Sequence, residues 1–227
     1  MDINDIKYGS PDIKLMTRHA RATRGDLRDI IPELATIRPR PNNKAGEELE
    51  FMMELERSLL DEFIDEADVD FRESFQSELG IKLKDVDRDG STEAWLDQAH
   101  DLIGHLKVHH NRPRPYQMAS MLGVDMHPMK SISAHSPSFP SGHTAQAILY
   151  ALALAPSMNE DERNRAVMLA VDIAQSRIEA CYHFPTDNEY GLQVAKRIAA
   201  HWSTPRHMRD LAWLIDSIQP NAWTSGF

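Results

Sequence analysis

The sequence lacks several features that would restrict its class, beginning with cysteine. Among its 227 residues only Cys181 is a cysteine, so no disulfide can form within the chain. No apolar run approaches the roughly 18 residues that a membrane-spanning helix requires. Residues 1–20 also lack the apolar core of a secretory signal. We therefore expect a soluble, cytoplasmic protein with no membrane span.

The chain also lacks an excess of positive charge and the alternating pattern of β-strands. Its formal net charge is −10, which argues against nucleic acid as a partner and confines any anion site to a local basic pocket. Hydrophobic residues make up 41% of the chain, as is usual for a globular protein. Apolar residues recur at helical spacing instead, which predicts an all-α helical bundle.

Two parts of the chain differ in their pattern. Residues 1–44 mix proline, glycine and charge, which predicts an irregular arm with one short helix near 25–36. Residues 45–227 predict a single all-α domain, which opens with an amphipathic helix over 46–66. The apolar stripe of this helix comprises Leu49, Met52, Met53, Leu55, Leu59 and Leu60. The stripe either packs inside the monomer or joins copies into a homo-oligomer.

Further helices follow from the same periodicity. They are predicted over 70–79, 91–110, 114–121, 144–155, 159–182, 187–202 and 206–218. Ser91 or Thr92 is the expected N-cap of the second of these. The Asp-rich segment 85–96 resembles half of an EF-hand, but Leu96 stands where calcium needs a bidentate Glu. We therefore assign no calcium site there.

The first chemically unusual segment is KVHHNRPRP, residues 107–115, at the end of a predicted helix. Basic side chains at a helix C-terminus complement its dipole, which accounts for Lys107 and the two histidines. Arg112 and Arg114, each followed by proline, also suit forked recognition of phosphate oxygens. The segment alone does not decide between these interpretations. The histidines have no carboxylate or cysteine at ligand spacing, so no metal site is predicted.

The second segment is PSGH, residues 140–143, immediately before the apolar run that starts at Thr144. The first N–H groups of a helix have no intrahelical partner, and with the helix dipole they form an anion site. His143 can supply a proton near neutral pH at this place. An ordinary N-terminal turn with an exposed imidazole is the competing interpretation.

The third segment runs from Ser176 and Arg177, late in one predicted helix, to the start of the next. Asp187 follows His183 by four residues. Across a helix-opening turn, this spacing can bring the carboxylate to one imidazole nitrogen and leave the other free as a nucleophile. A purely structural hydrogen bond between the two is the competing interpretation.

Together the three segments match the signature of the type 2 phosphatidic acid phosphatase superfamily, which reads K-x6-RP, PSGH and SR-x5-H-x3-D. The first part corresponds to Lys107 and Arg114–Pro115, the second to 140–143, and the third to 176–187. Residues 100–200 most resemble the soluble class A bacterial acid phosphatases, although no export signal is visible. The resemblance implies the helical bundle that acid phosphatases share with vanadium haloperoxidases.

The resemblance also implies a role for each matching residue. His183 would be the nucleophile and form a phosphohistidine, Asp187 would stabilise its imidazolium, and His143 would act as general acid and base. The phosphate-binding residues would be Lys107, Arg114, Ser141, Gly142 and Arg177. No metal and no cofactor would be required, because three cations meet the charge of the phosphoryl group.

Three functions are therefore expected in order of preference. The first is a metal-independent phosphatase acting on a small phosphorylated substrate, either a phosphomonoester or a diphosphate. The second is a vanadium-dependent haloperoxidase, because vanadate binds the same kind of pocket in enzymes that share most of this signature. The third is a phosphate- or phospholipid-binding module without turnover, which would need only the cations.

Overall fold

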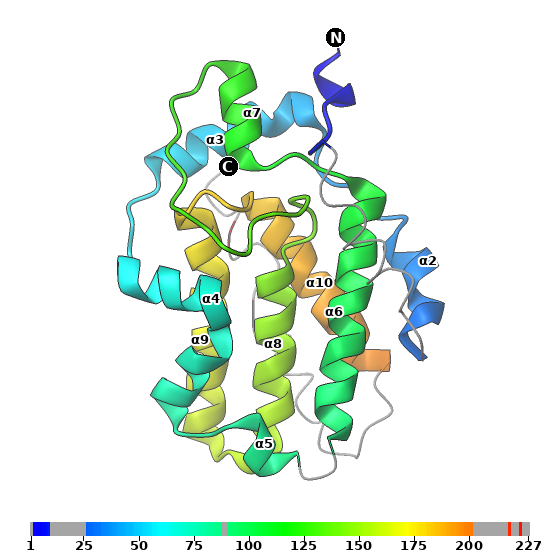
Figure 1. The fold of residues 1–227 in the computed structure, drawn as a ribbon, viewed down its shortest axis with the longest axis vertical. Helices are drawn as coiled ribbons and strands as arrows, with labels where there is room; N and C mark the ends of the chain where they lie inside the picture. The colour runs from blue at the N-terminus through cyan, green and yellow to red at the C-terminus, as the bar shows by residue number, and fades with distance from the viewer. Residues whose placement is uncertain (1, 10–25, 88–89, 202–217, 219–222, 224–227) are drawn as a thin grey trace.

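The structure is a computed structural model that describes residues 2–9, 26–87, 90–201, 218 and 223. Within this part of the chain every regular element is a helix, which confirms the all-α prediction (Figure 1). The elements are η1 (Ile3–Asp5), η2 (Asp26–Ile30), α2 (Ile31–Leu34), η3 (Asn42–Lys44), α3 (Ala45–Glu54), α4 (Asp61–Leu79), α5 (Leu83–Val86), α6 (Ser91–His110), α7 (Pro115–Leu122), α8 (Gly142–Leu154), η4 (Ala155–Ser157), α9 (Glu160–Glu179) and α10 (Pro185–His201).

Helix α8 is the centre of the bundle. It packs against α4, α6, α9 and α10, and nearly all of its side chains are buried. A helix that is surrounded on every side must be apolar all round, which explains the uninterrupted run of Ala and Leu after Thr144. The surrounding helices each bury one face, so they keep charged residues on the other.

The direction of the helices brings distant segments together at one end of the bundle. Helices α6 and α9 run towards the end where α3 and α7 lie, and α8 and α10 start from that end (Figure 1). The C-termini of α6 and α9 and the N-termini of α8 and α10 therefore meet there. Each of the three motif segments lies at one of these termini.

Helix α6 occupies the residues predicted from the sequence, but its cap differs from the prediction. Its N-cap is Gly90, whereas the prediction had Ser91 or Thr92 cap the helix through a side chain. The carboxylate of Asp87 does so instead, accepting from the N–H of Thr92 at 3.1 Å and of Glu93 at 2.8 Å. An acidic side chain from the preceding turn satisfies these N–H groups as well as a hydroxyl would.

The prediction of a single helix over 46–66 is wrong. Helix α3 ends at Glu54, Leu55 is extended, and α4 begins only at Asp61. The N–H groups of Ser58 and Leu59 donate to the buried carboxylate of Glu179, at 3.2 and 3.1 Å. This distant acceptor takes donors that a continuous helix would direct to its own carbonyls.

The break also divides the apolar stripe of that predicted helix. Leu49 and Met52 are buried in the main core, whereas Met53 is 52% and Leu60 is 73% exposed. The helix predicted over 70–79 forms the second half of α4, which kinks at Asp70 (φ −157°, ψ 97°). The helix predicted over 206–218 lies almost entirely outside the described residues.

The N-terminal arm contains the predicted short helix, as η2 and α2. Leu27, Ile30 and Leu34 from this segment are part of the main hydrophobic core. The side-chain amide of Asn42 donates to two carbonyls of the 3–6 segment, at 3.1 and 2.9 Å. In the described part of the chain, no helix has both the length and the apolar character needed to cross a membrane.

Candidate active site

Backbone hydrogen bonds tie the three motif segments to one another. The N–H of Ser138 donates to the carbonyl of Arg112 at 2.9 Å, which joins the loop before α8 to the end of α6. The N–H of Ser141 donates to the carbonyl of Asp187 at 3.0 Å, which joins that loop to α10. Helix α10 can approach this closely because residue 191 is glycine: a Cβ there would lie 2.7 Å from the carbonyl oxygen of Ser141.

A cavity of about 490 Å³ lies where these segments meet. Its wall includes six of the eight residues that the sequence predicts for the site, namely Lys107, Arg114, Gly142, His143, Arg177 and His183. The other two, Ser141 and Asp187, are fully buried directly behind this wall. The structure therefore brings all eight residues together, although they are spread over 80 positions of the sequence.

Lys107 is buried at the end of α6, and its Nζ donates to the carbonyl of Pro137 at 2.8 Å. The lysine stem packs beside Gly142, where an added Cβ would lie 3.5 Å from the lysine Cε. Burial, together with the positive charge of Arg114, holds the pKa of Lys107 well below its usual value. An anion bound in the cavity would favour the positively charged form of Lys107, which this environment otherwise disfavours.

Arg114 is held by acceptors on two sides of the cavity. Its Nε donates to the carbonyl of Ser136 at 2.8 Å, and one terminal nitrogen donates to the carbonyl of Tyr182 at 2.7 Å. That same nitrogen lies 3.0 Å from Nε2 of His183. Neutral carbonyls position the guanidinium without cancelling its charge, so the charge stays available to a ligand.

Arg177 is fixed from the N-terminal half of the chain. One terminal nitrogen donates to the carboxylate of Asp68 at 3.0 Å and the other donates to the carbonyl of Ile64 at 2.8 Å, both on α4. Burial lowers the pKa of Arg177 to about 10, so the guanidinium remains charged at neutral pH. Its partner Asp68 is a residue that no motif in the sequence indicates.

Asp68 also holds the loop that forms part of the cavity wall. Its carboxylate accepts hydrogen bonds from the hydroxyls of Ser131 and Ser133 and from the N–H of Ile132, at 2.5 to 2.9 Å. Burial alone would raise the pKa of Asp68, but the hydrogen bond from Ser133 and its neighbours holds this pKa below the usual value. One carboxylate thus positions both a cavity cation and a cavity wall.

Ser141 is the N-cap of α8 and accepts from the N–H of Thr144 at 3.5 Å. Its hydroxyl also lies 2.8 Å from the hydroxyl of Thr144, whose single proton is shared between Ser141 and Oδ1 of Asn188 at 2.9 Å. Gly142 and His143 open the helix, and the N–H groups of the first turn have no intrahelical acceptor. This end of α8 carries the positive end of the helix dipole towards the cavity.

His143 is half-buried on the first turn of α8, edge-on to the ring of Phe71 with 6.1 Å between ring centroids. Burial, and then the nearby charge of Arg177, hold the pKa of His143 well below its usual value. The charges of Lys107 and Arg114 act in the same direction. This imidazole is therefore neutral around pH 7.

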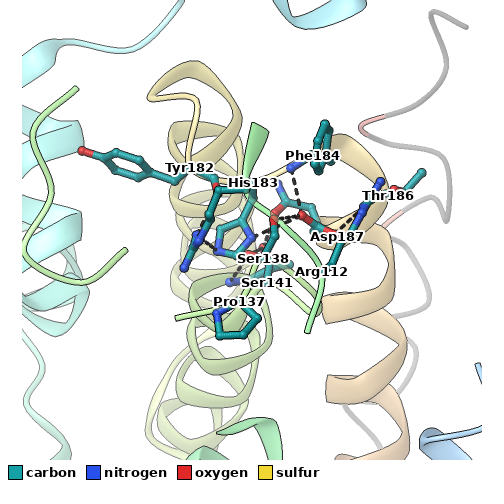
Figure 2. Close-up of polar contacts among 12 residues, drawn as sticks. Arg112, Pro137, Ser138, Ser141, Tyr182, His183, Phe184, Thr186 and Asp187 are labelled. Carbon is teal, nitrogen blue, oxygen red and sulfur yellow. Dashed lines mark hydrogen bonds and ion pairs between the residues drawn. The ribbon is translucent and has the colours of Figure 1, made fainter. Parts of the chain in front are cut away.

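His183 is buried, and its two ring nitrogens face different groups. Nε2 lies 3.0 Å from a terminal nitrogen of Arg114, while Nδ1 lies 3.5 Å from Oδ2 of Asp187 (Figure 2). A guanidinium can only donate hydrogen bonds, so Nε2 is the nitrogen without a proton. The proton of the neutral ring is then on Nδ1, on the side of the carboxylate. Burial and the charge of Arg114 hold the pKa of His183 well below its usual value.

Asp187 is surrounded by donors. Its Oδ1 accepts from Arg112 at 2.6 Å, and its Oδ2 accepts from the hydroxyl of Ser138 and from the N–H of Phe184 at 3.0 Å (Figure 2). Burial alone would raise the pKa of Asp187, but the charge of Arg112 and the neighbouring donors hold it far below the usual value. The side chain is therefore a carboxylate at all physiological pH values.

Arg112 does not take part in the forked phosphate recognition that was one of the two interpretations of its segment. It lies outside the cavity wall and forms ion pairs with Asp187 and Glu48, each at 2.6 Å. Glu48 comes from α3 and is a second residue that the sequence motifs do not reveal. Two arginines only two positions apart thus bind on different sides, since Arg114 lines the cavity and Arg112 does not.

No group of three or more histidine, cysteine or acidic side chains in the described residues is arranged to hold a metal ion. The nitrogen-bearing side chains at the cavity include the imidazoles of His143 and His183 among three cations. This donor set suits an anion with several oxygens, because each cation and each free N–H can donate to one of them.

Comparison with known proteins agrees with this chemistry. The model of the PAP2 superfamily matches residues 99–209, which include all three motif segments. A search of curated proteins found no match to the chain. A match to this superfamily suggests phosphatase or related phosphoryl-transfer activity on a small phosphorylated substrate. This match supports the type 2 phosphatidic acid phosphatase superfamily for residues 99–209 of the chain.

Proposed function

We propose that the protein is a phosphatase that hydrolyses phosphomonoesters or diphosphates without a metal ion, through a phosphohistidine on His183. The observation that supports this most directly is the arrangement of His183. Its Nε2 carries no proton and faces the cavity cations, while Asp187 lies behind Nδ1. A histidine with these neighbours is activated for attack on an electrophile bound by the same cations.

The phosphoryl group would bind among the three cavity cations. Lys107, Arg114 and Arg177 would contact its non-bridging oxygens, with the N–H of Gly142 and the hydroxyl of Ser141 as further donors. Arg114 would transfer its hydrogen bond from Nε2 of His183 to a phosphate oxygen, which frees the nitrogen lone pair. These donors are already held in place, so little reorganisation is needed as charge develops on the equatorial oxygens.

In the first step Nε2 of His183 attacks phosphorus, the N–P bond forms and the bond to the leaving oxygen breaks. The ring becomes positively charged, and Asp187 stabilises this charge across the 3.5 Å to Nδ1. His143 donates a proton to the leaving oxygen, so an alcohol departs. For this the imidazole must first be protonated.

The low pKa of His143 is consistent with such a role. Apart from burial, the cause of the low pKa is the charge of Arg177, Lys107 and Arg114. A phosphate dianion bound to these cations offsets their charge and raises the pKa of the imidazole. His143 would therefore acquire its proton as the substrate binds.

In the second step water attacks the phosphohistidine. His143, now neutral, accepts a proton from this water, the N–P bond breaks, and inorganic phosphate and neutral His183 result. The same three cations stabilise the negative charge of the phosphoryl oxygens in both steps. The reaction in this account requires no metal ion.

The cavity is larger than a phosphoryl group, and the rest of its wall indicates what kind of leaving group it can hold. A volume of about 490 Å³ falls in the range of pockets that hold small organic ligands. Ile103, Ile132 and Ala134 contribute apolar surface, and His135 and Gln146 contribute polar groups. We infer that the leaving group is an organic alcohol or phosphate of moderate size.

Phosphate release in excess EDTA tests this function. Purified protein should hydrolyse p-nitrophenyl phosphate with chelator present, and vanadate should inhibit because it mimics the trigonal bipyramidal transition state. Activity that disappears with EDTA and returns with Mg²⁺ or Zn²⁺ would contradict the proposal. Bromide oxidation with vanadate and peroxide that is faster than phosphate release would favour the haloperoxidase instead. Phosphate binding without either reaction would favour a binding module.

A further inference from the structure

A buried chain of alternating charges connects the N-terminal half of the protein to His183. It begins with Glu48 on α3, continues through Arg112 after α6, and ends with Asp187 on the first turn of α10 (Figure 2 shows the last two). Both ion pairs have N–O distances of 2.6 Å, and all three side chains are at most 1% exposed. Glu48 lies outside residues 99–209, the part that matches the superfamily.

Arg112 is held rigidly within this chain. Its two terminal nitrogens donate to different carboxylates, and its guanidinium lies over the ring of Phe184, 4.1 Å from the ring centroid. Thr186 closes the arrangement: its hydroxyl accepts from Arg112 at 3.0 Å and donates to Oε1 of Glu48 at 2.7 Å. Because both terminal nitrogens of Arg112 are bound in this way, its side chain cannot reach a ligand in the cavity.

The contacts of Arg112 determine how the two oxygens of Asp187 are used. Oδ1 is bound by Arg112, so Oδ2 is the oxygen that faces Nδ1 of His183. If Arg112 were absent, Oδ1 would be buried without a charged donor. A buried carboxylate in that condition rotates to another donor or takes up a proton.

We propose that Arg112, held by Glu48, is a positioning residue that keeps Oδ2 of Asp187 directed at the nucleophilic histidine. This inference rests on the proposed phosphatase function. Glu48 has a second effect, because it offsets the positive charge of Arg112. Without that compensation Arg112 would oppose the positive charge that develops on His183 when the phosphohistidine forms.

Kinetics of four variants test the role. In Arg112→Gln we expect kcat to fall on the order of 100-fold, as is typical when a reacting group is misplaced by about 1 Å. KM should change little, since Lys107, Arg114 and Arg177 still bind phosphate. Arg112→Lys keeps the positive charge but cannot donate to both carboxylates at once. Glu48→Gln keeps the size of the side chain but no longer offsets the charge of Arg112. Both variants should lose less activity than Arg112→Gln.

Glu179→Gln is the matched control. Glu179 is also a buried carboxylate that ties the N-terminal half to the C-terminal half, through Ser58 and Leu59, but it has no link to Asp187. The Glu179→Gln variant should be less stable than wild type but should retain its kcat. Circular dichroism and thermal unfolding of every variant identify any that does not fold, and Arg112→Lys and Glu48→Gln then carry the test.

The acid side of the pH–rate profile distinguishes positioning from mere structural support. The charged groups around Asp187 and His183 are Lys107 from α6, Arg112 and Arg114 from the segment after it, and Glu48 behind Arg112. Loss of the Arg112 charge raises the pKa of both Asp187 and His183, so the acid limb of Arg112→Gln moves to higher pH. In Glu48→Gln the positive charge of Arg112 remains and is no longer offset by Glu48, so the acid limb of this variant does not move to higher pH.

Imidazole ¹⁵N NMR of His183 provides a readout that does not depend on turnover. Wild type should show the Nδ1–H tautomer, Arg112→Gln should show a changed tautomer population or pKa, and Glu179→Gln should match wild type. Unchanged His183 signals in folded Arg112→Gln would overturn the inference. A wild type without phosphatase activity but with these signals would contradict the proposed function and leave the positioning role intact.

Discussion

Two regions of the molecule contribute to the same cavity in different ways. The segment 107–187 provides every cation and imidazole assigned to the phosphoryl group, and each lies in a recognisable motif. The segment 42–79 provides the carboxylates of Glu48 and Asp68, which reach Arg112 and Arg177 from behind the cavity. The groups that face a ligand are thus encoded as local patterns, whereas the groups that hold them come from a distant part of the chain.

Substitution of His183 should give the largest effect, because it removes the reacting atom from the motif-bearing region. Without Nε2 no phosphohistidine can form, so His183→Ala should lose turnover with every substrate. Phosphate binding should persist, because Lys107, Arg114 and Arg177 remain. Steady-state assays and phosphate binding by calorimetry check this pair of outcomes. Full turnover in the variant would place the nucleophile elsewhere.

His143→Ala should show an effect that depends on the leaving group. Without a general acid an alkoxide must leave unprotonated, whereas p-nitrophenolate is already stable as an anion. The loss of kcat should therefore be much greater for an alkyl phosphate than for p-nitrophenyl phosphate. Equal losses on the two substrates would remove support for the acid role of His143.

Asp68→Asn tests whether the N-terminal region matters to the cavity through Arg177. Breaking this buried pair should lower the free energy of unfolding by about 3 kcal/mol. The loop at Ser131–Ser133 loses its anchor as well, so KM should rise on the order of tenfold, equivalent to about 1.4 kcal/mol. The control is Asp65→Asn, an exposed carboxylate on the same helix. If both variants behaved like wild type, the support from α4 would be dispensable.

A smaller effect is expected from His110, a motif-region residue that does not face the cavity. It is 7% exposed and packs edge-on to Phe139, and burial lowers its pKa to about 4. The unfolded chain binds a proton near the ordinary pKa of about 6.5, so stability is lost as pH falls from there towards 4.

Replacement of His110 by Phe keeps a ring against Phe139 and removes the titration. Thermal unfolding of wild type and His110→Phe at pH 7 and pH 4.5 should show a smaller decrease in Tm for the variant. His143 and His183 have lowered pKa values too, so part of the decrease should remain. An identical decrease in both proteins would show that His110 does not contribute.

The extent to which the fold could be predicted follows the range of the interactions. The limits of α6 and the position of the cavity residues depend on local periodicity and spacing, which a sequence displays directly. The break at 55–60 depends on Glu179, about 120 positions away, so the helical pattern before it gives no warning. Likewise Asp68 meets Arg177 across 109 positions and Glu48 meets Arg112 across 64. Charged residues on a helix are usually solvated, and only tertiary structure shows which are buried.

Trapping of the covalent intermediate tests the central claim most directly. Wild-type protein mixed with p-nitrophenyl phosphate should be quenched rapidly without acid and digested, and the peptides should be analysed by mass spectrometry. His143→Ala should accumulate more of the intermediate if activation of water dominates its role. The account predicts a phosphoryl group on the peptide that contains His183. A phosphoryl group on the peptide that contains His143, or none on either during rapid turnover, would contradict it.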